Sequence, residues 1–370
     1  MPPAFSDGSH RVSLEAMPRP ARISGLDVAR AIALFGMFAA HIGNAGQYGP
    51  GGWRWLEATH GRSSALFTVL AGVSIALMLS RSSAADPVRH TRLRVVVRAV
   101  ILVILGWALT LLVTPVDVIL DNLGVMFVLA LVAFRWKPWM LLGVGTAILA
   151  VGSEVLAPIV EHLPEWLYEL PVLHELWGVH YPALIWVGYV LVGMGIGRLA
   201  PWRGGALGAL AASGAVLAAI AYGTGAWLLT SNGHEVVWGD ESPPSSLWFS
   251  ISAHSYTGFE MLGNAGVAML AIAACCWLAA VLPRITWPLA ATGSMTLTLY
   301  TVQIIAIALI GPTIVYEPTN AALVATCVVC VLFACLWKWR LGQGPLEQLL
   351  TSMSSVIADA DAKRRVSAPA

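Results

Sequence analysis

Three ionisable side chains with helical spacing stand in the first long apolar stretch of the chain, DVARAIALFGMFAAHIGNAG, which spans 27–46. Asp27 precedes Arg30 by one helical turn, and His41 follows Arg30 by about three turns, so the three side chains lie on one stripe about 20 Å long. A charged group that faces lipid costs about 2.5–3.5 kcal/mol, so we expect this stripe to face protein or water. An imidazole in such a stripe can accept a proton or act as a nucleophile. The simpler alternative is an Asp27–Arg30 ion pair near the inner interface, with His41 among the lipid headgroups.

The elements that position these residues are membrane-spanning helices. Of the 370 residues, 58% are hydrophobic and 11% are charged, whereas soluble domains carry about 25% charged residues. We expect one all-α, polytopic membrane helical bundle over 25–340, a disordered tail over 1–24, and an amphipathic segment with a loose end over 341–370. About ten transmembrane helices are expected, at 25–44, 62–80, 95–114, 117–134, 138–158, 181–200, 205–230, 258–282, 287–311 and 319–338.

The distribution of positive charge predicts the orientation of this bundle. If the amino terminus lies in the cytoplasm, all but three of the 21 Lys and Arg residues fall on the cytoplasmic side or in the tails. The exceptions are Arg30, inside the first span, and Arg54 and Arg62, on the outer side. Positive residues favour cytoplasmic loops, so both termini are expected in the cytoplasm. Membrane lipids are the expected partners, the net charge of +1 suggests no nucleic acid, and an oligomer is compatible with the sequence.

Several polar residues interrupt the later spans. Asp121 stands in the fourth span, where a carboxylate is a functional candidate by default. Tyr300 and Gln303 stand in the ninth span and either line a pocket or join helices by hydrogen bonds. The five cysteines all lie in apolar runs, so we expect neither a disulfide framework nor a metal site.

A second polar group stands where the eighth span begins on the outer side. Glu260 and Asn264 are four residues apart and therefore share a helix face. His254 and Ser255 lie just before them in the sequence. These residues either line the entrance for a substrate or tie a loop to the end of a helix.

The blocks around the stripe resemble those of known membrane acyltransferases. RAIALFGMFAAH resembles the first-helix Arg-x10-His motif of the type-3 membrane acyltransferases. The longer blocks ISGLDVARAIALFGMFAAH and GRSSALFTVLAGVSIALMLSR are more similar to the bacterial heparan-α-glucosaminide N-acetyltransferase-like proteins, which often pair with a domain of unknown function numbered 418. YPALIWVGYVLVGMGIGRL, HSYTGFEMLGNAGVAML, TGSMTLTLYTVQIIAIAL and GPLEQLL resemble the later blocks, so the resemblance spans about 23–350.

The resemblance implies an enzyme of the bacterial plasma membrane that transfers an acyl group, in the first place acetyl. The donor would be cytoplasmic acetyl-CoA or another acyl-CoA, and the acceptor a hydroxyl or amine of a glycan or other envelope molecule on the outer side. No metal is implied. The first cytoplasmic loop supplies a cluster suited to the donor phosphates, although basic loops also serve topology and anionic lipid; its members are Arg81, Arg89, Arg92, Arg94 and Arg98.

Two histidines compete for the central chemical role. His41 would act as general base or as acyl carrier, while Asp27 and Arg30 lie too far down the helix to touch it and either hold the helix or meet the donor. His60 stands where related enzymes carry a histidine just before the second span, although its local motif matches poorly. Gln303 replaces a histidine expected after LTLY, and an amide cannot transfer a proton near neutral pH.

A transporter is the alternative class of function. Ten spans with intramembrane Asp27, Arg30 and Asp121 would also serve a proton-coupled carrier of small solutes. Against a transporter stands the absence of a visible repeat and of broken half-helices at matching positions.

Overall fold

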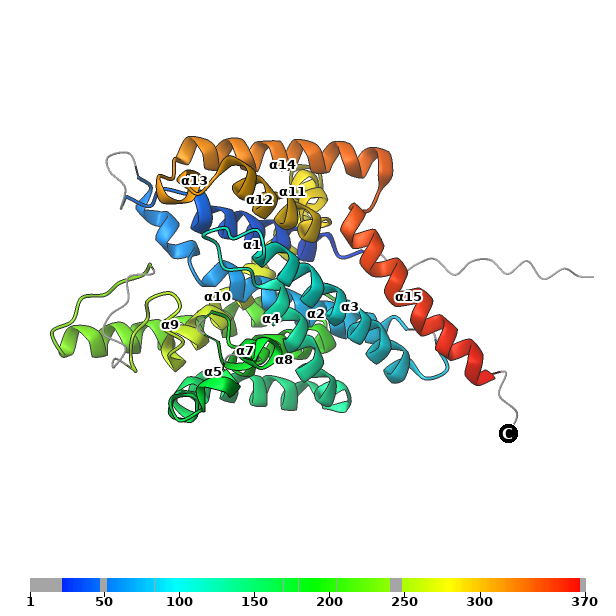
Figure 1. Ribbon diagram of the computed structural model, residues 1–370, viewed down its shortest axis with the longest axis horizontal. Coiled ribbons are helices and arrows are strands. Elements are labelled where there is room, and N and C mark those ends of the chain that lie inside the picture. The colour runs from blue at the N-terminus through cyan, green and yellow to red at the C-terminus, as the bar shows by residue number, and fades with distance from the viewer. Residues whose placement is uncertain are drawn as a thin grey trace, which may run out of the picture.

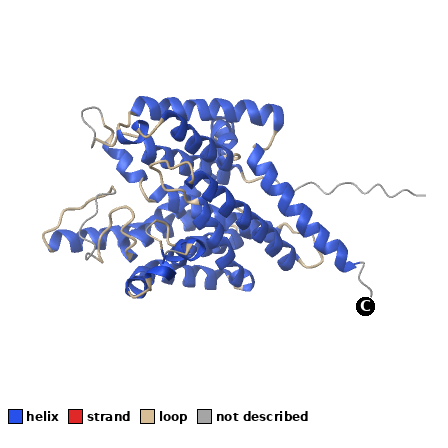
Figure 2. Ribbon diagram, in the orientation of Figure 1, coloured by secondary structure: helices blue, strands red, loops and turns tan. Residues whose placement is uncertain are grey.

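The computed structural model describes residues 22–46, 52–82, 84–168, 170–178, 180–203, 205–239 and 248–366, and these residues form helices and loops without a strand (Figure 2). The elements are α1 (Ser24–Ile42), η1 (Arg54–Thr59), α2 (Arg62–Ser80), α3 (Pro87–Thr110), α4 (Leu120–Ala130), η2 (Leu131–Arg135), α5 (Pro138–Glu161), α6 (Glu165–Tyr168), α7 (Pro171–Trp177), α8 (Ala183–Leu199), α9 (Leu207–Ser231), α10 (Gly258–Val281), α11 (Pro283–Gly293), α12 (Thr296–Ile310), α13 (Thr313–Tyr316), α14 (Asn320–Leu341) and α15 (Pro345–Val366). Most of the expected tail lies outside the described residues.

The predicted membrane bundle is confirmed. Seven elements in the described residues are long and apolar enough to cross a membrane: α1, η1 with α2, α3, α5, α9, α10 and α14. The bent pair α11–α12 passes the same test as one broken span, and α8 is a shorter apolar helix. Together with α4 and η2, these elements are compatible with the ten expected spans, of which seven, or eight with the bent pair, pass the length and hydropathy test within the described residues.

The third span begins earlier than expected, at Pro87 instead of residue 95. Asp86 caps the helix, because its Oδ1 accepts a hydrogen bond from Arg89 N at 3.1 Å, and proline suits the first helical position. Four of the five arginines expected in a loop therefore lie on a helix, and Arg81 follows the end of α2. Arg94 and Arg98 are four residues apart and share one face of α3, whereas Arg89 and Arg92 share another.

The ninth span is broken. Helices α11 and α12 meet at an angle of 60° around Ser294 and Met295. Glu347 of α15 caps the new helix start, since its carboxylate accepts from Thr298 N at 3.1 Å and from Thr298 Oγ1 at 2.6 Å. A Cβ at Gly293 would collide with the backbone carbonyl of Asp27, so only glycine lets α11 pack this closely on α1.

The C-terminal segment is helical through Val366, where a short amphipathic helix and a loose end were expected. Arg89 holds Asp361 with two hydrogen bonds of 2.8 Å, and His90 Nε2 lies 2.9 Å from Asp359 Oδ1. These pairs join α15 to α3, which sequence hydropathy alone does not register. In Figure 1 the long helix α14 runs across the view and α15 leaves the bundle at the right. The end of the bundle where α15 meets α3 is called the inner end below, and the opposite end the outer end, in keeping with the orientation expected from the charge pattern.

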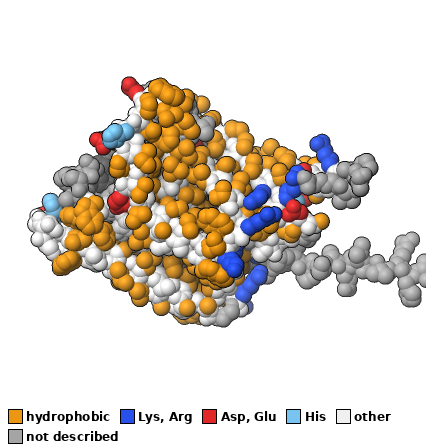
Figure 3. All heavy atoms as spheres, turned by 90° about the horizontal axis from the view of Figure 1, so that it is seen from below, with side chains coloured by type: hydrophobic (Ala, Val, Ile, Leu, Met, Phe, Trp, Pro, Cys, Tyr) orange, Lys and Arg blue, Asp and Glu red, His pale blue; other side chains and the backbone are white. Residues whose placement is uncertain are grey.

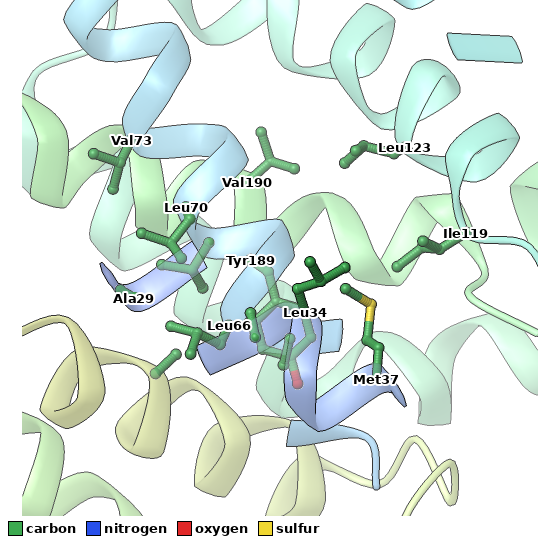
Figure 4. Packing of buried hydrophobic residues seen from close by; sticks show 14 of the residues in the cluster. Ala29, Leu34, Met37, Leu66, Leu70, Val73, Ile119, Leu123, Tyr189 and Val190 are labelled. Atoms are coloured by element: carbon green, nitrogen blue, oxygen red, sulfur yellow. The ribbon is translucent and has the colours of Figure 1, made fainter. Parts of the chain in front are cut away.

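The core is built around α1 and α2. Two-thirds (67%) of each of these spans is buried, against 17% for α5 and α14 at the periphery. Small residues let α2 and α8 approach closely, because a Cβ at Gly72 or Gly193 would collide with the carbonyl of the facing helix. Figure 4 shows Leu34 and Met37 of α1 within the apolar cluster that joins these helices to α4.

The outer surface is suited to lipid. Ile104, Ile220 and Val329 lie on three different helices and are each more than half exposed. Figure 3 shows apolar side chains over most of one face, with Lys and Arg gathered toward one end. The protein is therefore a multi-pass membrane protein, with its positive charge concentrated toward one end of the bundle.

Candidate functional site

Two cavities lie toward opposite ends of the bundle. The inner cavity, about 510 Å³, takes its walls from α1, α2, α3, α4, α12 and α15. The outer cavity, about 440 Å³, lies between the outer ends of α1 and α2 and the loops before α4, α8 and α10. The stripe of the first helix serves both, since Asp27 and Arg30 line the inner cavity and His41 lines the outer one.

The inner cavity has a strongly basic mouth. Five arginines line it against two carboxylates, those of Asp27 and Glu347; the arginines are Arg22, Arg30, Arg81, Arg94 and Arg98. Thr296, at the start of α12, also lines the cavity, and the carboxylate of Glu347 caps this helix start. An anionic ligand fits this mouth.

Asp27 organises part of this mouth. Its carboxylate is buried and lies 2.5 Å from both Arg22 Nε and Arg30 Nη1. Arg30 also donates to Ser74 Oγ at 2.8 Å. Two arginines thus share one carboxylate, and the surplus positive charge remains available on the cavity wall.

The arginine cluster of the sequence divides between two places. Arg81, Arg94 and Arg98 line the inner cavity, and Arg94 Nε is buried without a hydrogen-bond partner among the described residues. Arg89 and Arg92 instead line a separate hollow beside η2. Arg92 donates to Leu131 O, and Arg89 pairs with Asp361. Arg92 Nε is likewise buried without a partner among the described residues, so the position of Arg94 on the wall of the inner cavity is what makes its guanidinium a candidate for binding a ligand.

The deep end of the inner cavity is apolar. Its walls there come from α2, α4 and α12, namely Phe67, Ala71, Leu120, Leu123 and Leu297. A ligand with a charged head and a long, less polar arm matches this change of lining.

The outer cavity contains the histidine of the stripe. His41 Nδ1 lies 3.3 Å from Gln303 Oε1. With the amide in this orientation Oε1 accepts, so Nδ1 carries the proton and Nε2 is the basic nitrogen. Gln303 therefore stands beside the histidine and orients it. The amide itself remains neutral.

A loop before α10 forms the opposite wall of the outer cavity. Glu260, buried at the start of α10, accepts hydrogen bonds from His254 N at 3.0 Å and from Tyr256 N at 2.7 Å. Ser255 Oγ donates to the same carboxylate at 3.3 Å, and Asn264 Nδ2 donates at 3.0 Å. Of the two alternatives for this group, the contacts show the tie between a loop and a helix end, which presents His254 and Tyr256 to the cavity.

Backbone strain gathers around the same cavity. Among the described residues, five that are not glycine have positive φ, and three of them line the outer cavity: Tyr181 (+54°), His254 (+59°) and Tyr256 (+56°). Such conformations cost about 1–3 kcal/mol each and persist where the surroundings enforce them, often at functional sites. Burial raises the pKa of Tyr256 well above its ordinary value, so this hydroxyl stays protonated and can donate.

His60, Asp121 and Tyr300 line neither of the two cavities. His60 is buried, and its carbonyl accepts a hydrogen bond from Arg62 Nη1 at 3.3 Å. Asp121, buried at the start of α4, accepts from Asn122 N at 2.9 Å, and Tyr300 is buried in α12. Burial, and to a smaller extent the charge of Asp121, raises the pKa of Glu175 in α7 to about 7.

Three residues of the outer cavity escaped the sequence analysis: Asp117, His180 and Tyr181. Asp117 and His180 stand in loops, where no helical period relates them to the stripe. The aromatic residues around HYPAL, where the resemblance places a block, are the one signal that pointed to this region. In the part of the chain that the structure describes, no group of three or more His, Cys, Asp or Glu side chains is placed to hold a metal ion.

A thin wall separates the cavities. On α2, Ser64 lines the outer cavity and Phe67 the inner one, three residues or about 4.5 Å of helix apart. On α1, Arg30 and Met37 are seven residues or about 10 Å apart, and the buried Leu34 lies between them. The two cavities together therefore reach almost through the bundle.

Comparison with known proteins agrees with this architecture. Residues 22–229 match the model of the family described as heparan-alpha-glucosaminide N-acetyltransferase, catalytic. Residues 243–356 match a protein family of unknown function, DUF418. No curated protein matches the chain. The first match covers more than half of the chain and contains α1 to α9, so the protein belongs to the heparan-α-glucosaminide N-acetyltransferase family of membrane transferases.

Proposed function

We propose that the protein transfers an acyl group from cytoplasmic acyl-CoA to a hydroxyl or amine on the outer side of a bacterial plasma membrane. Acetyl is the first candidate for this acyl group. The acceptor belongs to a glycan or another envelope molecule. His41 is the residue at which the transfer occurs, as general base or as acyl carrier. The observation that carries the proposal is the pair of cavities, which meet at a thin wall near this histidine.

The inner cavity suits the donor. Acyl-CoA carries phosphates at one end and a thioester on a long arm at the other. The arginine-lined mouth matches the phosphates, because guanidinium groups bind phosphate oxygens with paired hydrogen bonds. The apolar deep end receives the arm, which then points its thioester toward the wall beside Phe67.

The outer cavity suits the acceptor and the chemistry. His41 Nε2 is the basic nitrogen when Nδ1 donates to Gln303. Tyr256 offers a protonated hydroxyl, which can donate to the oxyanion that develops on the attacked carbonyl. The tied loop fixes this hydroxyl through Glu260.

The experiment uses purified protein in nanodiscs with acetyl-CoA. Isothermal titration measures donor binding, and a thiol reagent measures CoA release with candidate sugars and amino sugars. We expect micromolar binding for the wild type, and for His41→Ala retained binding with loss of turnover. Turnover that survives in His41→Ala but disappears in His60→Ala would move the chemistry to His60.

A transporter is the competing reading, and the broken pair α11–α12 is the one feature that favours it. Transporter sites often use a pair of broken helices in matching positions, and the described residues contain one bent pair. The same preparation distinguishes the two functions. Solute uptake into proteoliposomes without donor binding or CoA release would refute the acyltransferase.

A further inference from the structure

A second histidine, paired with a carboxylate, faces the outer cavity. Asp117 stands in the loop before α4, and His180 in the segment before α8. Asp117 Oδ2 lies 3.3 Å from His180 Nδ1, and both residues line the cavity that His41 also lines. Each side chain is about half exposed, so the pair is accessible to a ligand in the cavity.

The segment that carries His180 is held in place. Tyr181 follows it with φ +54°, and its ring packs edge-on against Trp186, with centroids 4.9 Å apart, and against His254, 5.6 Å apart. Tyr181 N also donates to Tyr256 Oη at 3.4 Å. The contacts fix a strained backbone at the position where His180 meets Asp117.

The two histidines have partners of different charge. One contact of His41 is a neutral amide, which orients the ring and adds no charge of its own. His180 meets a carboxylate, which holds the tautomer with its proton on Nδ1 and stabilises the imidazolium that forms when Nε2 accepts another proton. An oriented ring with a basic Nε2 suits a nucleophile, and a ring paired with a carboxylate suits a base.

We propose that the two histidines divide the reaction: His41 carries the acyl group, and the Asp117–His180 pair takes the proton of the acceptor. This inference rests on the proposed function and adds its mechanism. It names a catalytic base, His180, and a positioning residue, Asp117, that acts through it.

The first half-reaction loads the histidine. His41 Nε2 attacks the thioester carbonyl, the new C–N bond forms and the C–S bond breaks. CoA leaves as a thiolate into the inner cavity and takes a proton from cytoplasmic water. The acyl-imidazolium keeps its proton on Nδ1, which donates a hydrogen bond to Gln303 Oε1.

The second half-reaction unloads it. The acceptor hydroxyl or amine attacks the acyl carbon, and the C–N bond breaks, which returns His41 to its neutral form. The acceptor proton passes to His180 Nε2, and Asp117 stabilises the resulting imidazolium. His180 then releases the proton to water on the outer side.

The test measures the two halves separately. Protein in nanodiscs receives radiolabelled acetyl-CoA without a sugar acceptor, and the assay counts both CoA released and label bound to protein. Discharge of the label is then followed in water, with glucosamine, and with hydroxylamine, a strong nucleophile that attacks acyl-imidazoles without a base. His162→Ala is the matched control, because His162 is an exposed outer histidine that lines neither cavity.

For His180→Ala we expect label to bind as in the wild type, with discharge to water and glucosamine slowed by about 100-fold or more and discharge to hydroxylamine retained. Asp117→Asn slows the same discharge by a smaller factor, and His41→Ala binds no label. Unchanged discharge in His180→Ala overturns the inference, as does its failure to load label while it still binds donor. Turnover in the wild type without any bound label also overturns it and leaves the proposed function standing. Absence of donor binding and CoA release in the wild type refutes the proposed function itself.

Discussion

The division of the arginine cluster between two places makes the sharpest test of the donor site. Arg94 and Arg89 stand on the same helix, carry the same charge and lie close to the same membrane surface. Arg94 lines the inner cavity with an unsatisfied Nε, whereas Arg89 is engaged by Asp361 through two hydrogen bonds of 2.8 Å. Replacement of each by glutamine removes one charge from the same helix, at positions about 7.5 Å apart along its axis. Only Arg94→Gln should remove a contact to the donor.

The magnitude follows from the strength of a charged hydrogen bond. A hydrogen bond to a charged group contributes about 1.5–3 kcal/mol, and 1.4 kcal/mol corresponds to a tenfold change in affinity. We therefore expect Arg94→Gln to raise the Kd for acetyl-CoA by about 10- to 100-fold. Arg89→Gln should change it by less than about threefold, through long-range electrostatics that salt screens.

The assay is isothermal titration in nanodiscs at two salt concentrations. A second ligand, S-acetyl-N-acetylcysteamine, carries the thioester but no phosphate, and serves as a control on the ligand side. Its binding should be equally weak in the wild type and in Arg94→Gln. Equal loss of acetyl-CoA affinity in both arginine variants, or equal sensitivity of the phosphate-free thioester, would refute the assignment of the mouth to phosphates.

Three further outcomes are expected. Gly293→Val should lower the melting temperature and the yield of folded protein, since its side chain would collide with the Asp27 carbonyl where α11 packs on α1; a light-scattering melt beside Gly143→Val, whose site is open, checks this. Gln303→Leu should lower turnover by about 10-fold or more while the Kd for the donor is unchanged, because the partner that orients His41 is lost; steady-state CoA release measures it. Burial raises the pKa of Glu175 to about 7, so between about pH 4.5 and pH 7 the folded protein keeps a proton that the unfolded chain releases, and the folded state loses stability as the pH rises through this range. The difference between the melting temperatures at pH 5 and pH 8 should therefore be smaller in Glu175→Gln than in the wild type. An identical difference in both proteins contradicts the assignment.

Much of the fold is readable from the sequence, because hydropathy reports the spans directly. The break at Ser294–Met295 is not readable, since apolar residues continue on both sides of it and its cap, Glu347, comes from a distant helix. The extent of α15 escaped for a similar reason. Its charged end looks loose by composition and is held by Arg89 and His90 of α3.

The site divides in the same way. The spacing of Asp27, Arg30 and His41 predicts one stripe, because the fixed rise and rotation per residue of an α-helix determine which side chains share a face. The structure shows that this stripe reaches both cavities. The arginines could not be assigned to different faces while α3 was expected to begin at residue 95, because spacing along the chain defines a common face only for residues within a helix. Asp117 and His180 come together only in the tertiary fold, so their spacing along the chain does not predict the 3.3 Å contact between Asp117 Oδ2 and His180 Nδ1.

The thin wall between the cavities also has an electrical consequence. If water fills both cavities, it carries its high dielectric inward from both sides, and a membrane voltage would then fall mainly across the short apolar stretch between Ser64 and Phe67. A charge that crosses this stretch exchanges about 2.3 kcal/mol per 100 mV with the field, whereas a neutral acyl group crosses without electrical work. Leu34, buried at the same level of α1, helps to insulate this stretch. The short apolar stretch would therefore let an uncharged acyl group pass from one cavity to the other and oppose the passage of ions.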